Sequence, residues 1–313
     1  MTKAIFKLPP IKNEPLKTYA PGSPERQELK DKIAELRKGS LDLPMIIDGK
    51  EVRTGNLLDI RPPHDHQHLL GHYHQGGKEH VQMAIEAALK AKPAWECMSW
   101  ESRAAIFLKA ADLMSGPYRQ SLNAVTMLGQ GKNVYQSEID AVGELIDFYR
   151  YNVKNMYDLY AMQPNSSDGI WNRMVWRPLE GFIFALTPFN FTAIAGNLGG
   201  APALMGNTVV WKPSKTAVYA AHLVMTILQE AGLPDGVMNL VYVSGPDASE
   251  VVLNDENFAG IHFTGSTRVF DGMWEKIAKN VPKYKSYPRI VGETGGKDYV
   301  FADHTADPKQ VAT

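Results

Sequence analysis

The chain has 313 residues, of which 44% are hydrophobic and 21% are charged, enough for about two structural units and a large buried core. Its 33 Lys and Arg nearly balance 34 Asp and Glu, so charge gives no reason to expect nucleic acid or an anionic membrane as a partner. The single cysteine, Cys97, excludes a disulfide framework and a Cys-based zinc site. These properties favour a protein that acts on a small molecule.

The first forty residues contain several acids and do not resemble a secretory signal or an acid-poor transit peptide. The longest apolar runs fall far short of the roughly 18 residues that a membrane span needs. We therefore expect no presequence and no membrane association. The expected location is the cytoplasm for a bacterial source, with the mitochondrial matrix as the alternative for a eukaryotic one.

The first half of the chain predicts a helical region preceded by short strands. A helix is expected over 24–38, with Ser23 as N-cap and Gly39 as its stop. The Asp48-Gly49 pair within 45–54 predicts a hairpin, and a further strand is expected over 57–61. Apolar spacing over 79–160, interrupted at Pro93 and at two glycine-containing turns, predicts about four helices. Alternation over 171–176 predicts a strand.

After Gly181, short apolar runs alternate with helical segments. The predicted strands lie within 181–189, 207–213, 239–245, 260–266 and 289–302. Near-continuous apolar strands separated by helices are typical of a parallel sheet covered on both faces, so the fold class is α/β. Ligands in such sheets bind beyond the carboxyl ends of the strands.

Polar residues follow the predicted strands where a ligand would bind. They are Thr187 and Asn190 after the first strand, Lys212 and Ser214 after the second, Thr264 to Ser266 after the fourth, and Glu293 to Lys297 near the fifth. Taken alone, each of these residues is as consistent with a turn, a helix cap or a solvated surface position as with a ligand site. Because they occur in order on successive strands of one sheet, we expect them to meet in one crevice.

Five motifs follow one another along the chain: PFNFT at 188–192, GNTVVWKPS at 206–214, GLPDGVMNLV at 232–241, FTGST at 263–267 and GETGGK at 292–297. Together they resemble the aldehyde dehydrogenase superfamily from about Met45 to the end of the chain. Further passages, including EIDAVGELIDFYRYN and PFNFTAIAGNL, resemble the 1-pyrroline-5-carboxylate dehydrogenase branch. That resemblance implies NAD-dependent oxidation of L-glutamate 5-semialdehyde to L-glutamate in proline breakdown.

The resemblance also implies roles for individual residues. Asn190 matches the asparagine whose amide donates to the developing oxyanion, and Glu293 matches the general base that activates the hydrolytic water. That role requires a pKa raised by partial burial. Glu144 and Phe191 are candidates to line the aldehyde pocket, the alternatives being an ordinary helical Glu and a core Phe.

For the cofactor NAD, Lys212 resembles the lysine that binds the adenosine ribose, and Thr187 lies beside backbone that contacts the dinucleotide. The segment Gly265, Ser266, Thr267, Arg268 and Val269 resembles the helix start under the pyrophosphate. The glycine that many members carry after FTGST is absent. Lys215 stands where many NAD-preferring members have an acid, so the choice of NAD over NADP rests on the branch resemblance alone.

The resemblance implies a Rossmann-like cofactor domain with a helical amino-terminal region and without the catalytic domain. The expected organisation is an arm over 1–44, a carboxyl-terminally incomplete NAD-binding domain over 45–162 and 179–313, and the strand region of an oligomerisation element over 163–178. The complete protein is expected to be a homo-oligomer. Truncation would expose apolar surface, so poor solubility is expected.

The family nucleophile is a cysteine that, counted onward from Glu293, falls beyond Thr313. Cys97 lies far upstream without a motif around it, so we interpret it as a structural cysteine and expect this chain alone to be inactive. Two alternatives stay open: another semialdehyde dehydrogenase, such as a succinate semialdehyde enzyme, and a non-catalytic dinucleotide-binding fragment. His64, His66 and His68 alternate without an obvious carboxylate partner, so we predict an exposed segment and no metal site.

Overall fold

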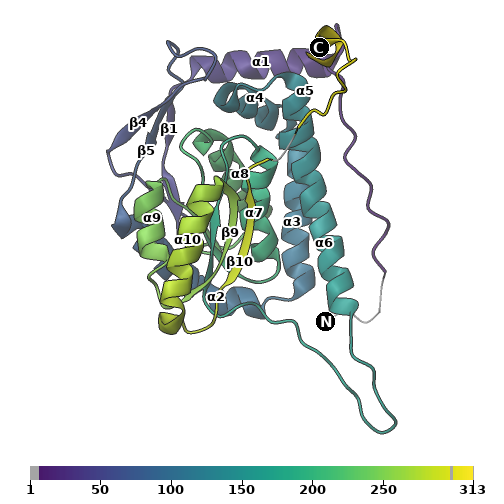
Figure 1. Ribbon diagram of the computed structural model, residues 1–313, viewed down its shortest axis with the longest axis vertical. Helices are drawn as coiled ribbons and strands as arrows, with labels where there is room; N and C mark the ends of the chain where they lie inside the picture. Colours follow the sequence, from purple (N-terminus) through teal and green to yellow (C-terminus); the bar gives the residue numbers. More distant parts are fainter. Residues whose placement is uncertain (1–6, 297–298, 313) are drawn as a thin grey trace.

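A seven-stranded sheet forms the centre of the structure, a computed structural model that describes residues 7–296 and 299–312 (Figure 1). The strand order is β10-β9-β6-β7-β8-β2-β3, and the five strands from β10 to β8 are mutually parallel. Their bounds are β6 Phe182–Leu186, β7 Thr208–Lys212, β8 Met238–Leu240, β9 Phe258–Gly265 and β10 Arg289–Thr294. The parallel α/β sheet predicted from the apolar runs is confirmed.

The predicted hairpin extends this sheet at one edge. Strands β2 (Met45–Ile47) and β3 (Lys50–Val52) are antiparallel, and β2 pairs with β8. Asp48 and Gly49 have φ values of 51° and 73°, the left-handed geometry of a two-residue type I′ hairpin turn. A Cβ on Gly49 would lie 1.9 Å from a carboxylate oxygen of Asp235, so both the turn and the packing require glycine.

Helices cover both faces of the sheet. The helices α7 (Thr192–Leu204) and α8 (Val218–Ala231) connect β6, β7 and β8 on one face, where α6 packs on α7 and α3 on α8. The helices α9 (Gly245–Val252) and α10 (Thr267–Asn280) lie on the opposite face (Figure 1), where α2 packs on α9. The remaining helical bounds are α2 Lys78–Cys97, α3 Trp100–Ser115, α4 Arg119–Gln130, α5 Val134–Ser137, the π-helical η1 Glu138–Glu144, α6 Leu145–Ala161, the 3₁₀ turn η2 Val281–Lys283 and α11 Pro308–Ala312.

The amino-terminal segment is tied to the helical layer by a buried ion cluster. Glu14 is 8% exposed and pairs with Arg119 and Arg150, each at 2.7 Å, while Arg119 also pairs with Glu138 at the start of η1. The helix α1 (Pro24–Lys38) follows with the predicted bounds, and a small sheet of β1 (Leu41–Leu43), β5 (Gly71–His74) and β4 (Leu57–Ile60) lies beyond it.

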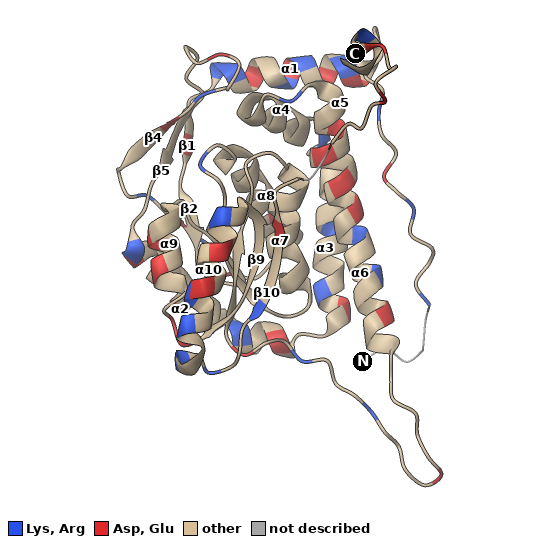
Figure 2. Cartoon of the chain, in the orientation of Figure 1, with Lys and Arg blue, Asp and Glu red and all other residues tan. Residues whose placement is uncertain are grey.

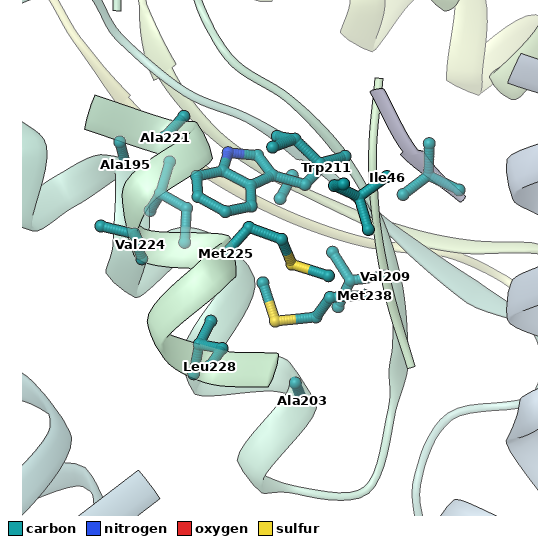
Figure 3. Close-up of a cluster of buried hydrophobic side chains, with 14 of the residues drawn as sticks. Ile46, Ala195, Ala203, Val209, Trp211, Ala221, Val224, Met225, Leu228 and Met238 are labelled. Atoms are coloured by element: carbon teal, nitrogen blue, oxygen red, sulfur yellow. The ribbon is translucent and has the colours of Figure 1, made fainter. Parts of the chain in front are cut away.

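Apolar side chains fill the core between the sheet and α8. Figure 3 shows Trp211, Val209 and Met238 from the strands, with Met225 and Leu228 of α8 pointing into the same space. All five side chains are at most 3% exposed. Burial of apolar surface contributes about 25 cal/mol per Å² to the stability of the fold. This packing fixes the position of the strands whose ends carry the polar residues.

Two local predictions are wrong. The helix α2 continues through Pro93 to Cys97, because Trp95 is buried and its indole N–H donates to the Ala203 carbonyl at 2.9 Å, which anchors the last turn. Residues 171–176 form no strand. They belong to an extended loop with one isolated bridge, Ser167 to Ile170, and no described strand lies beside them to accept their backbone hydrogen bonds.

Candidate functional site

The middle of the sheet contains a topological switch point. From the central strand β6 the chain builds β7 and β8 on one side, then crosses to build β9 and β10 on the other. In open α/β sheets the crevice at the carboxyl ends of such strands is the ligand site. Leu186 at the end of β6 is in register with Lys212 of β7 and Phe263 of β9, and Glu293 of β10 is in register with Thr264. The structure therefore brings the predicted polar residues to one edge.

The loop after β6 carries Asn190 and Phe191. A buried carboxylate from another element, η1, accepts hydrogen bonds from the backbone that follows this loop. Asp140 of η1 is 1% exposed and accepts hydrogen bonds from the backbone N–H groups of Thr192 and Ala193 at 3.0 and 2.9 Å. Position 191 at the start of α7 offers no capping side chain, so Asp140 supplies the anionic cap that the helix start favours. The sequence motifs did not identify Asp140.

Lys132 completes this anchor. Its ammonium lies 2.6 Å from Asp140 and 4.2 Å from the centre of the Phe191 ring, a cation–π geometry. The Thr192 hydroxyl also bonds Thr126 and Gln130, each at 2.9 Å. Phe191 is 38% exposed, so it is not a core residue. Asn190 is exposed beside it.

Lys212 lines a cavity of about 420 Å³ at the carboxyl ends of β7 and β8. Burial lowers the pKa of its ammonium. No described residue accepts a hydrogen bond from this ammonium or forms an ion pair with it. Thr187, whose hydroxyl accepts the Trp211 indole N–H at 3.1 Å, fixes the adjacent strand end. A desolvated cation without an acceptor suits a hydroxylated or anionic ligand.

The lining of this cavity includes residues after β8 that no sequence motif identified. Val243, Ser244 and Gly245 follow β8 and line the same cavity as Lys212. The rule that ligands bind beyond strand ends applies to β8 as well, so that rule was the available signal. Ser244 caps α9, because its hydroxyl accepts the Asp247 N–H at 3.2 Å and donates to the Asp247 carboxylate at 2.6 Å.

The predicted pyrophosphate segment opens a helix at the end of β9. Gly265 is the last residue of β9, Ser266 occupies the N-cap position of α10, and α10 begins at Thr267. Residues 266–269 are exposed and Ser266 makes no side-chain cap. Backbone N–H groups at a helix start bind anions, so Gly265, Ser266, Thr267, Arg268 and Val269 have the chemistry expected of that segment.

Glu293 lies on β10 beside Thr264, whose hydroxyl donates to it at 3.4 Å. The expected partial burial is not found, because β10 is an edge strand here and Glu293 is exposed. Glu144, at the end of η1, is half-buried and lines a cavity of about 680 Å³ between the amino-terminal segment, η1 and α6. Burial and the negative charges of Asp140 and Glu293 raise the pKa of Glu144. Figure 2 shows the acidic residues that recur along this part of the helical layer.

Cys97 lies at the opposite edge of the sheet. The helix α7 starts at the carboxyl edge and ends at the amino edge, where Ala203 accepts the hydrogen bond from Trp95. Cys97 follows two residues later, at the end of α2, and is exposed. It therefore stands apart from Asn190 and Glu293.

The described residues contain no group of three or more His, Cys, Asp or Glu side chains placed to hold a metal ion. The position of Lys297, the last residue of the GETGGK motif, lies outside the described part of the chain. No helix within residues 7–296 and 299–312 is long and apolar enough to cross a membrane.

A doubly wound sheet with a polar crevice at its switch point defines a dinucleotide-binding type of α/β domain. The chain belongs to the aldehyde dehydrogenase family, whose family model matches residues 51–313. It is 53% identical over 306 residues to delta-1-pyrroline-5-carboxylate dehydrogenase of Agaricus bisporus, covering 97% of this chain and 56% of the relative. It is 45% identical to the mitochondrial delta-1-pyrroline-5-carboxylate dehydrogenase of Danio rerio, covering 97% of this chain and 54% of that one.

A solved structure shares the fold closely. The delta-pyrroline-5-carboxylate dehydrogenase of Mycobacterium tuberculosis bound with NAD superposes with a TM-score of 0.94 at 50% identity, covering 98% of this chain and 58% of that one. The chain thus spans about half the length of the relatives it matches. The Rossmann-like fold and the family predicted from the motifs are confirmed.

Proposed function

We propose that this chain supplies the cofactor-binding half of an NAD-dependent dehydrogenase that oxidises L-glutamate 5-semialdehyde, the open form of 1-pyrroline-5-carboxylate, to L-glutamate. The observation that carries the proposal is the convergence of Asn190, Lys212, the α10 start and Glu293 at one sheet edge. The similarity to relatives named for this activity, one of them bound with NAD, supports the substrate and the cofactor.

The donor chemistry of the crevice fits a dinucleotide. Lys212 would donate to the ribose hydroxyls, and the backbone N–H groups of Thr267 and Arg268 in the first turn of α10 would hold the pyrophosphate. Thr187 would fix the backbone between these two places through its bond from Trp211. NAD, when bound, supplies the hydride acceptor.

The remaining residues would act on the aldehyde. The Asn190 amide would donate to the carbonyl oxygen as negative charge develops, an interaction of roughly 3 to 4 kcal/mol in comparable sites. Glu293 would take a proton from the water that attacks the thioester formed with a cysteine thiol. Because Cys97 lies at the opposite edge, we place that thiol outside these 313 residues. Glu144 and Phe191 would border the aldehyde.

The purified chain provides the first test. We expect it to bind NAD in a calorimetric titration and to form no NADH from pyrroline-5-carboxylate. Formation of NADH that is lost on Cys97→Ser substitution would contradict the placement of the nucleophile. Failure to bind NAD at any accessible concentration would contradict the cofactor site.

The complete protein provides the second test. Glu293→Gln should stall after acylation, so intact-mass spectrometry should detect an adduct on the protein. Glu256→Gln is a suitable control, because Glu256 is an exposed acid whose partner is Lys285 on the surface. Undiminished turnover by the Glu293→Gln protein would remove Glu293 from the mechanism.

We also propose that residues 163–178 form the contact of a homo-oligomer in the complete protein. Trp171 and Val175 are 83% and 80% exposed on this extended loop, an unusual place for large apolar side chains. Trp171→Glu should lower the mass measured by light scattering coupled to gel filtration. An unchanged mass would argue against this contact.

A further inference from the structure

A segment without helix or strand, residues 13–19, holds the start of the π-helical η1, and we call it the strap. The backbone N–H of Lys17 and the hydroxyl of Tyr19 both donate to the Glu138 carboxylate at 2.8 Å. Glu138 is the first residue of η1 and is 1% exposed. Removing a donor from a buried carboxylate is costly, so these bonds tie the strap to η1. Figure 1 shows this part of the chain running beside α6 toward α1.

The strap also covers the other end of η1. A Cβ on Gly143 would lie 2.5 Å from a methyl carbon of Leu16, so Leu16 packs directly on the bare backbone there. The Asp147 carboxylate of α6 accepts hydrogen bonds from the Asn13 amide and the Glu14 backbone N–H, each at 2.7 Å. The strap therefore contacts both ends of η1 and the helix that follows it.

The segment η1 in turn holds the backbone next to Asn190. Asp140 comes two residues after Glu138 and is 1% exposed. Its carboxylate accepts the backbone N–H groups of Thr192 and Ala193 at 3.0 and 2.9 Å. Thr192 stands two residues after Asn190, so a shift of Asp140 moves the backbone that presents the Asn190 amide.

The π-helical form of η1 decides where Asp140 lies. Residues 134–161 form one run of α5, η1 and α6, and the middle of this run has i→i+5 instead of i→i+4 hydrogen bonds. Such turns are rare and occur frequently at functional sites. An α-helical residue advances about 100° around the helix axis, so relaxation of η1 by one residue would rotate Asp140 by about that angle relative to α6. Contacts from outside the helix, including those of the strap, are therefore needed to keep Asp140 against the start of α7.

We propose that the strap is a positioning element of this dehydrogenase, which keeps η1 in its π-helical register and thereby sets the place of the Asn190 amide. The inference rests on the proposed function, in which that amide donates to the developing oxyanion. It assigns to Leu16 and Tyr19 a role that no sequence motif indicated. Both residues act through η1, so they are positioning residues and not catalytic ones.

The first experiment perturbs the strap at two places. Leu16→Ala removes the contact with the η1 backbone, and Tyr19→Phe removes one donor to Glu138. Leu16→Met keeps an apolar side chain of similar volume and should behave like the parent chain. Leu57→Ala is the matched control, because Leu57 is 47% exposed and Leu16 is 48% exposed, and Leu57 belongs to the small sheet. Circular dichroism verifies that each variant folds.

Hydrogen exchange on the chain itself measures the link from the strap to the loop. The amides of Thr192 and Ala193 should exchange about tenfold faster in Leu16→Ala and in Tyr19→Phe, because their acceptor is held less firmly. Exchange in Leu16→Met and in Leu57→Ala should match the parent chain. Unchanged exchange at both amides in Leu16→Ala and Tyr19→Phe alike would overturn the inference.

Turnover by the complete protein tests the catalytic consequence. Leu16→Ala should lower kcat by about tenfold, a part of the loss of about 10² to 10³ that removal of an oxyanion donor causes, and should leave the KM for NAD unchanged. The same substitution should have little further effect when Asn190 is already replaced by alanine, because the amide that the strap positions is then gone. A general structural loss would lower turnover by the same factor in both backgrounds, and that result would overturn the inference.

The outcomes also separate the inference from the function beneath it. Full turnover by the Asn190→Ala protein would overturn the oxyanion role in the proposed function and, with it, the catalytic part of the inference. Loss of turnover in Asn190→Ala, together with a Leu16→Ala protein as active as the parent, would overturn the inference and leave the proposed function intact.

Discussion

Replacing Asp140 by alanine should destabilise the chain strongly and loosen the loop that carries Asn190. The carboxylate is 1% exposed and accepts two backbone N–H groups at 3.0 and 2.9 Å and the Lys132 ammonium at 2.6 Å. Hydrogen bonds to a charged group contribute about 1.5 to 3 kcal/mol each, and loss of one partner of a buried ion pair costs about 3 to 5 kcal/mol. Because these losses overlap, we expect a decrease of about 3 to 5 kcal/mol in the free energy of unfolding.

Urea unfolding followed by circular dichroism measures this change, and hydrogen exchange localises it. The amides of Thr192 and Ala193 should exchange faster in the variant, since they lose their acceptor. Asp112→Ala is the matched control, because its side chain is 77% exposed and lies 3.6 Å from Arg150. Surface pairs of that kind contribute at most about 1 kcal/mol. A loss below 1 kcal/mol in Asp140→Ala, or unchanged exchange at these two amides, would refute the capping argument.

Three further predictions concern charge. Glu293→Gln should lower the pKa of Glu144 toward its ordinary value of 4.5, because burial, Asp140 and Glu293 together raise it; an unchanged ¹³C carboxyl titration would contradict this coupling. Burial lowers the pKa of Lys212 below 10.5, so the unfolded chain holds a proton that the folded chain has lost, and stability should rise with pH between the two values. Lys212→Met should remove that rise, and its persistence would exclude Lys212 as the source. Arg119→Ala leaves Glu14 and Glu138 without their shared cation, so the free energy of unfolding should fall by about 3 to 5 kcal/mol. Limited proteolysis should then release the amino-terminal segment. If that segment stays as protected as in the parent chain, Arg119 does not anchor it.

Elements with strong local signals were predictable from the chain alone. The helix over 24–38 has an N-terminal proline and a terminal glycine, and the hairpin has Asp48-Gly49 at its turn. The parallel strands follow from apolar runs that only a sheet covered on both faces can bury. These features depend on neighbours in sequence, so a single sequence contains the information.

Features that depend on distant partners were not predictable in the same way. The last turn of α2 persists beyond Pro93 because Trp95 bonds Ala203, more than one hundred residues away. The segment 171–176 alternates like a strand but has no described neighbour to pair with, and strand formation requires such a neighbour. Glu293 was expected to be partly buried, yet its edge strand leaves it exposed.

The amino-acid sequence by itself determined the family, the strand-helix alternation and the polar residues at the strand ends, because each depends only on local composition and spacing. Only the tertiary structure decided that Asp140 caps α7, that Cys97 lies at the far edge from Asn190, and that two lysines face a cavity without a described lining acid. The physical reason is that capping, separation and cavity charge are relations between side chains from different elements, and the packing of those elements sets them.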